Sequence, residues 1–330
     1  MSAKREAYLC LSAMLRAREP KLLNNDRAAR MLDAASFEEA AKLLTDSGYA
    51  DMSQMNAKEI EAYLTSRREE IFAELEKLAP DKIILDVFKM KYDYHNAKVI
   101  IKAEAMGQDA KRLMSASGRI APDKLLEIYN EDKISQLPAA FGEALSEAKS
   151  TLARTANPQL ADFILDRAYF AEIRAAAKTL GCPFLDGYAN ILTDSTNLKS
   201  AVRTVRMGKD LEFMDSALIP GGSVSTGRIV SAGDKESITA LFANTLLERA
   251  AALGAEAADG GSMTAFELAC DNAVTAYLRT AKLVSYGPEA VIAFLAAVES
   301  EITAVRMILT GRLAGIEPDT IRERLRDMYA

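Results

Sequence analysis

The sequence predicts an all-α protein built from three related segments. Across most of the 330 residues, apolar side chains recur three, four or seven positions apart, and this spacing places them on one face of a helix. One such stripe comprises Ile60, Leu64, Ile71, Leu75 and Leu78. No stretch alternates β-branched and polar residues between turn signals, so we expect almost no β-sheet. The division into related segments follows from an internal similarity between residues 93–109 and 194–210, and from a fainter third copy described below.

Capping residues, glycines and prolines divide the chain into helices. Ser36, with Glu39 three residues later, has the spacing of a capping box and opens a helix that we expect to end near Gly48. Pro80 separates one helix from a longer helix that ends near Gly107. Proline in a first helical turn lacks only an N–H that has no partner there, so several prolines begin helices. Further breaks are expected at residues 121–123, 157–158, 181–183, 219–222, 286–288 and 317–319.

Two parts of the chain resemble each other at a constant offset of 101 residues. Residues 93–98 (DYHNAK) and 194–199 (DSTNLK) share Asp, Asn and Lys at equivalent positions. Residues 106–109 (MGQD) and 207–210 (MGKD) share Met, Gly and Asp at the same offset. These six identities favour an internal repeat over a chance similarity between amphipathic helices, which is the alternative interpretation.

A third, fainter copy is expected 103 residues further on, where Gly311 corresponds to Gly208. The sequence GRI at residues 118–120 also recurs at residues 227–229, which suggests a linker between repeats. A period near 100 residues is longer than the 20–50 residues of most solenoid repeats, so it predicts three small helical bundles rather than a continuous superhelix. The predicted segments are residues 1–114, 115–219 and 220–330.

Few residues suggest catalysis or cofactor binding. His95 is the only histidine, and one histidine cannot supply a His-based metal site or a Ser-His-Asp triad by itself. Its polar flanks suggest a buried hydrogen-bond network at the start of a long helix. Residues 222–229 (GSVSTGRI) approach the phosphate-binding pattern, but Arg228 replaces its lysine and Ile229 replaces its magnesium-binding hydroxyl. We therefore expect no catalytic residues, no cofactor and no metal. A nucleotide-dependent enzyme that uses residues 222–228 is one alternative.

The composition indicates a cytoplasmic protein that reaches a membrane only through a partner. Cys10, Cys182 and Cys270 are far apart and form no CxxC pair, which is typical of a reducing compartment. The net charge of −6, from 41 basic and 47 acidic residues, argues against nucleic acid. The apolar run at residues 290–298 is far shorter than the ~20 residues that span a bilayer.

Basic residues gather in two places. Lys199, Arg203, Arg206 and Lys209 are three, four or seven residues apart and share a helical face. The last stretch of the chain is enriched in arginine, at Arg306, Arg312, Arg322, Arg324 and Arg326. One interpretation is an ordinary solvated surface. The other is an interface with a partner protein, because the planar guanidinium of arginine pairs well with carboxylates.

Taken in order, several segments make the chain resemble the C subunits of archaeal and bacterial V/A-type rotary ATPases, whose eukaryotic counterpart is designated d. The opening helix and the Glu-Glu, Leu-Leu and Gly-Tyr elements after it are similar to those of the family, and the ending is its most characteristic part. The segments are residues 8–19 (YLCLSAMLRARE), 36–49 (SFEEAAKLLTDSGY), 92–98 (YDYHNAK), 299–312 (ESEITAVRMILTGR) and 321–326 (IRERLR). The second repeat departs from the first, since Ser195 and Thr196 stand in the places of Tyr94 and His95.

This resemblance implies a funnel-like helical body with approximate threefold internal symmetry. It further implies a non-catalytic protein that couples the central stalk subunits D and F to the membrane proteolipid ring, so that ATP hydrolysis or synthesis is linked to H⁺ or Na⁺ transport. The stator membrane subunit is a further partner that it suggests. A helical-repeat scaffold of an unrelated complex is the alternative function.

Overall fold

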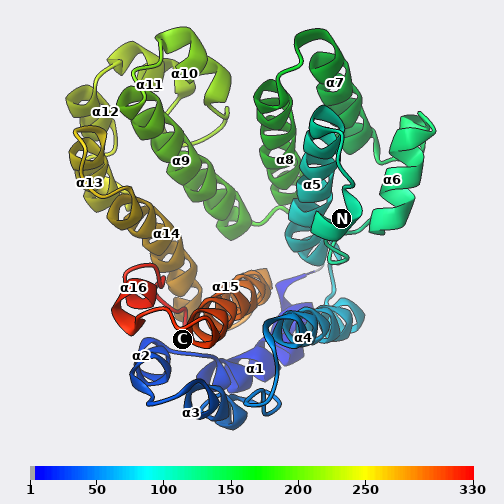
Figure 1. Ribbon diagram of the computed structural model, residues 1–330. Helices are drawn as coiled ribbons and strands as arrows, with labels where there is room; N and C mark the ends of the chain where they lie inside the picture. The colour runs from blue at the N-terminus through cyan, green and yellow to red at the C-terminus, as the bar shows by residue number, and fades with distance from the viewer. Residues whose placement is uncertain (1–3) are drawn as a thin grey trace. The chain divides into compact units, whose positions relative to one another are not determined.

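The computed structural model describes residues 4–330, and all regular secondary structure in that range is helical (Figure 1). The predicted all-α class is therefore confirmed. Internal contacts divide the helices into two compact units. One unit is residues 83–234, and the other joins residues 4–82 to Lys235–Ala330. The division into three segments at 1–114, 115–219 and 220–330 stays a prediction.

Residues 83–234 form the first unit, in which α5, α7 and α8 pack side by side (Figure 1). Next to them, α8 packs on α9, and α10 packs on α8, α9 and α11. The helices are α5 (Ile83–Met106), α6 (Pro122–Asn130), α7 (Ala139–Thr155), α8 (Pro158–Leu180), α9 (Pro183–Arg206), α10 (Leu211–Ala217) and α11 (Thr226–Ala232). Two short 3₁₀ turns, η4 (Lys111–Leu113) and η5 (Ile134–Gln136), connect α5 to α6 and α6 to α7.

Aromatic and aliphatic side chains fill the space between α5, α7 and α8. Tyr94 meets Phe141 edge to face with their ring centroids 5.0 Å apart, and Phe141 and Leu145 are fully buried. Burying a side chain of this size stabilises the fold by about 1.5–3 kcal/mol. This packing holds the central part of α5 rigidly.

The second unit is organised around α15 (Pro288–Leu313), which packs against α1, α2, α3, α4, α14 and α16. Every residue from Pro288 to Val298 is buried, because neighbouring helices cover this part of α15 on all sides. The apolar run at residues 290–298 is thus the centre of a protein core. The other helices are α1 (Leu9–Arg18), α2 (Asn25–Asp33), α3 (Phe37–Lys42), α4 (Ala57–Leu78), α12 (Lys235–Leu241), α13 (Glu248–Ala258), α14 (Met263–Arg279) and α16 (Pro318–Arg322). Its 3₁₀ turns are η1 (Arg5–Tyr8), η2 (Glu19–Lys21), η3 (Thr45–Ser47) and η6 (Thr280–Leu283).

The predicted helix boundaries are confirmed at most positions. Five helices begin with proline at the expected breaks, namely α6, α8, α9, α15 and α16. The Ser36 hydroxyl caps α3 as expected, accepting the Glu39 N–H at 3.3 Å, but α3 ends at Lys42 rather than near Gly48. The chain then turns through a 3₁₀ helix, and Gly48 adopts a φ of 78°.

The apolar stripe predicted at residues 60–78 lies on α4, but its last residue is exposed. Ile60, Leu64 and Leu75 are fully buried, whereas Leu78 is 47% exposed. Leu78 is the last residue of α4, so it lies at an end of the helix that its neighbours do not cover. In residues 4–330, no helix is both long and apolar enough to cross a membrane.

Candidate functional site

The long helices α5, α9 and α15 each bury a carboxylate that binds groups of another segment. The carboxylates belong to Asp93, Asp194 and Glu301, all at most 5% exposed. We call each carboxylate, together with the groups it binds, the helix anchor of α5, α9 or α15. Because a buried carboxylate is costly unless it is hydrogen-bonded, each anchor strongly favours one position of the bound segment.

The α5 anchor fastens the loop between α5 and α6. Asp93 accepts the backbone N–H groups of Arg119, at 2.9 Å, and Ile120, at 3.1 Å, and it also pairs with the Arg119 guanidinium at 2.6 Å. One turn further along α5, the buried Asn96 amide both donates to and accepts from the backbone of Ser115, each at 2.8 Å. The loop is therefore held at two points.

The α9 anchor repeats this geometry in the loop between α10 and α11. Asp194 accepts the backbone N–H groups of Ser223, at 3.0 Å, and Val224, at 3.2 Å. The Asn197 amide donates to and accepts from the backbone of Ile219, each at 2.8 Å. The Asp and Asn that the repeat analysis matched at an offset of 101 residues thus perform the same structural role in both helices.

Both loops approach their carboxylate so closely that only glycine fits. A Cβ atom at Gly118 would lie 2.3 Å from Asp93 Oδ1, and one at Gly222 would lie 2.1 Å from Asp194 Oδ1. The counterpart of residues 118–120 is therefore 222–224. The sequence match to 227–229 was wrong, because those residues lie inside α11.

The α15 anchor binds groups from the N-terminal part of its unit. Glu301 accepts the Leu23 backbone N–H and the Tyr49 hydroxyl, each at 2.5 Å. The Arg67 guanidinium lies over the Tyr49 ring, 3.9 Å from its centroid, and donates to the Gly48 carbonyl at 2.8 Å. This anchor joins segments that are more than 250 residues apart in sequence.

Each of these long helices ends in the same turn, fourteen residues after its buried carboxylate. Gly107, Gly208 and Gly315 adopt φ values of 62°, 62° and 71°. In each case the residue after the glycine donates to a carbonyl five residues earlier, at 2.9 to 3.1 Å, which is the hydrogen bond of a Schellman motif. Gly311, which the sequence matched to Gly208, lies within α15, and the glycine of this turn is Gly315. The third copy of the repeat stays a prediction.

Burial raises the pKa of all three anchoring carboxyls above the ordinary range. Hydrogen bonds from Arg119 lower the pKa of Asp93 and so offset part of the effect of burial. Hydrogen bonds from the Ser223 and Val224 N–H groups do the same for the pKa of Asp194. The pKa of Glu301 is likewise raised by burial, against the lowering effect of the Tyr49 hydroxyl.

His95 differs from its predicted place. It is exposed near the middle of α5, and its Nε2 atom lies 3.1 Å from the Leu113 carbonyl oxygen. The expected buried polar network instead contains its neighbours Asp93, Tyr94 and Asn96. Because α5 begins at Ile83, the helix presents successive residues in different directions, and His95 points away from the core.

The predicted interface residues of α9 gather at the C-terminal end of that helix. Lys199 is half-buried, and Arg203, Arg206 and Lys209 are exposed. The Lys209 ammonium lies 5.8 Å from the ring centroid of Phe213. The four side chains thus form one basic surface, whose contact with a partner stays a prediction.

The other three predicted interface residues make contacts within their own unit. Arg306 pairs with Glu61 of α4 at 2.5 Å. Arg312 donates to the Ala34 carbonyl at 2.5 Å, and Arg322 pairs with the last residue of α2 at 2.5 Å. These arginines therefore connect the C-terminal helices to the N-terminal ones, and a partner contact for them also stays a prediction.

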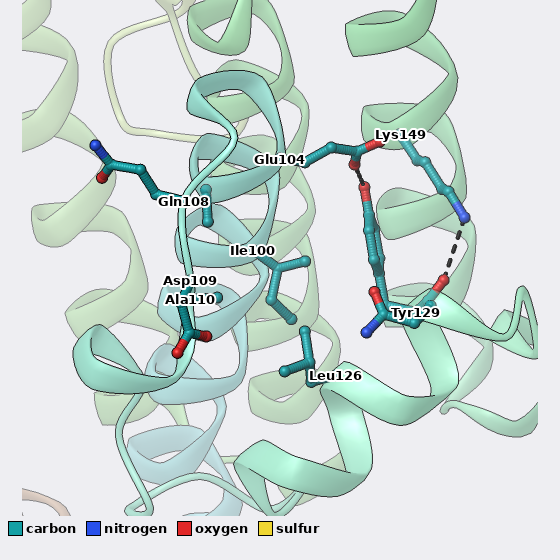
Figure 2. A pocket seen from close by; sticks show the side chains of 10 residues that line it. Ile100, Glu104, Gln108, Asp109, Ala110, Leu126, Tyr129 and Lys149 are labelled. Carbon is teal, nitrogen blue, oxygen red and sulfur yellow. Dashed lines mark hydrogen bonds between the residues drawn. The ribbon is translucent and has the colours of Figure 1, made fainter.

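A pocket of about 410 Å³ lies beside the end of α5 (Figure 2). Ile100 and Leu126 contribute apolar side chains to it. Tyr129 donates its hydroxyl proton to Glu104, and the Lys149 ammonium donates to the Tyr129 carbonyl at 3.2 Å (Figure 2). The central polar groups thus bond to one another, and none of the predicted interface residues lines the pocket.

The glycine-rich segment at residues 222–229 is committed to the α9 anchor. The N–H groups of Ser223 and Val224, which a phosphate-binding loop would present to its ligand, donate to Asp194. Arg228 lies within α11. Among residues 4–330, no group of three or more His, Cys, Asp or Glu side chains is arranged to hold a metal ion.

Comparisons with known proteins agree over nearly the whole chain. Residues 11–324 match the family described as ATP synthase (C/AC39) subunit. The C subunit of the V-type sodium ATPase of Enterococcus hirae is 25% identical, over 98% of this chain and 99% of that protein. The C subunit of the A-type ATP synthase of Methanocaldococcus jannaschii is 24% identical, over 96% of this chain and 86% of that protein. The C subunit of the V-type ATP synthase of Thermus thermophilus is 22% identical, over 59% of this chain and 62% of that protein.

Proposed function

Because the chain belongs to the ATP synthase (C/AC39) subunit family, we propose that it is a coupling subunit of a V/A-type rotary ATPase. It performs no chemistry of its own. It connects the central stalk subunits D and F to the membrane proteolipid ring, on the cytoplasmic side, so that ATP turnover and ion transport proceed together. The observation that carries this proposal is the family match over residues 11–324.

The helix anchors support this role. A protein that transmits torque must resist deformation, and each anchor fixes a loop or a distant segment to a long helix through buried hydrogen bonds. The common spacing between carboxylate and terminal glycine in α5, α9 and α15 supports the further proposal of three related lobes around an approximate threefold axis.

The basic end of α9 is the proposed contact with the rest of the motor. Arg203 and Arg206 are exposed there, and arginine pairs with carboxylates in a planar, two-point geometry. The stator membrane subunit is a further candidate partner in the same complex.

The function is tested with membranes from cells that lack this protein. Adding the wild-type chain is expected to restore ATP-driven ion transport, whereas without it ATP hydrolysis proceeds uncoupled or the complex falls apart. Adding the chain to a purified D–F pair separates this proposal from a scaffold of an unrelated complex, which would not bind the pair. Undiminished coupled transport in membranes without the chain would refute the proposal.

The contact role of α9 is tested by charge reversal. Arg203→Glu combined with Arg206→Glu is expected to weaken assembly about tenfold or more, since opposite charges become like charges at the interface. Lys124→Glu is the matched control, because Lys124 is an exposed cation of the same unit that pairs with a neighbour on α6. Equal assembly of the double variant and the control would exclude this contact.

A further inference from the structure

Large apolar side chains are exposed on both sides of the glycine turns that end α5, α9 and α15. At the end of α9, Met207 is 56% exposed and Leu211 is 48% exposed. Exposed apolar residues also flank the other two turns, at different positions relative to the glycine, namely Met106 and Leu113 around Gly107, and Leu313 and Ile316 around Gly315. Single exposed apolar residues are ordinary, but large apolar side chains exposed beside all three turns call for a functional explanation.

The turn that ends α9 is well ordered by its own bonds, so the exposure does not come from a frayed helix end. Gly208 and Lys209 donate to carbonyl groups of the last turn of α9, at 3.0 and 3.1 Å. Directly after the turn, Met214 is buried, and Phe213 packs edge to face on Phe163 with centroids 5.9 Å apart. Met207 and Leu211 are therefore presented on a rigid support.

This apolar pair has a basic rim. Arg203, Arg206 and Lys209 are exposed beside Met207. Residues 199–213 contain four basic and two acidic side chains, within a chain whose net charge is −6. One of the two acids, Asp210, is engaged in capping α10, since it accepts the Phe213 N–H at 2.8 Å. The end of α9 is therefore locally positive on a negative protein.

We infer that the end of α9 docks on an acidic protein surface that offers an apolar socket rimmed by carboxylates. In this contact Met207 and Leu211 enter the socket, and Arg203, Arg206 and Lys209 pair with the rim. This is the usual anatomy of a protein interface, in which an apolar centre is surrounded by polar and charged groups. The inference rests on the proposed function and adds the apolar centre of the contact.

A protein partner fits this surface better than a membrane does. Two apolar side chains supply little area for insertion into lipid, where stable binding takes a long amphipathic face or several anchors.

The test uses the full-length chain and ATPase complexes purified from cells that lack it. The variant is Met207→Ser combined with Leu211→Ser, and the matched control is Leu246→Ser combined with Leu283→Ser. The control residues are 52% and 88% exposed and lie outside the ends of α5, α9 and α15. We expect the variant to associate with the complexes at least about tenfold more weakly than wild type, and the control to associate like wild type. Thermal unfolding of both variants establishes that each is folded.

The outcomes separate this inference from the function on which it rests. If wild type and the Met207/Leu211 variant associate equally, the inference is overturned and the proposed function stands. If the wild-type chain fails to associate at all, both are overturned. Vesicles that contain anionic lipid are added as competitor in a parallel experiment. If vesicles displace the wild-type chain from the complexes but do not displace the Met207/Leu211 variant, the surface binds a membrane. That result would also overturn the inference.

Discussion

Substitution of Gly222 by alanine tests the α9 anchor directly. The added Cβ atom would lie 2.1 Å from Asp194 Oδ1, well inside van der Waals contact, so the loop or the carboxylate must move. The φ of Gly222 is not in the left-handed region, so the expected effect comes from this contact alone. Movement breaks the bonds from the N–H groups of Ser223 and Val224 to Asp194.

The size of the effect follows from the bonds that are lost. Hydrogen bonds to a charged group contribute about 1.5–3 kcal/mol each, and a buried carboxylate without partners adds a desolvation cost. Partial relaxation of the exposed part of the loop offsets some of this loss. We therefore expect Gly222→Ala to lower the free energy of unfolding by about 3 kcal/mol.

Urea denaturation measures this change, and Gly227→Ala is the matched control. Gly227 lies five residues later, inside α11, and a Cβ atom there meets nothing within 4 Å. Alanine in a helix is favoured over glycine by about 0.5–1 kcal/mol, so the control is expected to be neutral or slightly stabilised. Hydrogen exchange at the Ser223 and Val224 amides gives a local measurement that does not depend on cooperative unfolding of the two units.

A double-mutant cycle decides whether Asp194 is the cause. In an Asp194→Ala background the close contact is absent, so Gly222→Ala should cost much less than it does in wild type. Equal stability of Gly222→Ala and Gly227→Ala, with amide protection at Ser223 and Val224 unchanged, would contradict the reasoning. An equal cost of Gly222→Ala in both backgrounds would exclude the role of Asp194.

Three further outcomes are expected. Asn197→Ala removes both buried bonds to the Ile219 backbone and should destabilise the protein by about 2–4 kcal/mol in urea, and a loss below about 0.5 kcal/mol would contradict its anchoring role. Because burial raises the pKa of Asp194, the folded state binds this proton more tightly than the unfolded chain, so the stability of wild type relative to Asp194→Asn should fall as the pH rises from about 4 through the raised pKa. If the difference in unfolding free energy between wild type and Asp194→Asn stays constant or rises over that pH range, the pKa of Asp194 is not raised by folding. Arg306→Gln removes an ion pair with Glu61 in which both side chains are substantially exposed. Urea denaturation should therefore show a free energy of unfolding lowered by less than about 1 kcal/mol, and a larger decrease would mean that Arg306 has a structural role beyond this pair.

Much of the α5 and α9 anchors could be predicted from sequence, because both helices contain an Asp and an Asn three residues apart at one offset. The α15 anchor was missed because its acid is Glu301 and Ala304 stands where the Asn would be. A search for the fourteen-residue spacing between an acid and a terminal glycine would have found it. The exposure of His95 could not be predicted either, because which face of α5 is buried depends on the helices that pack against it, and residues 93–96 are polar or amphipathic throughout.

The sequence by itself determined the helical class, most helix boundaries and the family, since these depend on local periodicity, on proline and glycine geometry, and on the order of segments along the chain. Only the tertiary structure decided which polar residues became anchors and which remained exposed. That choice depends on contacts between distant segments, such as Glu301 with Leu23, where burial makes one hydrogen-bonded arrangement far more stable than any other. Nothing in the neighbouring residues of either segment specifies such a partner.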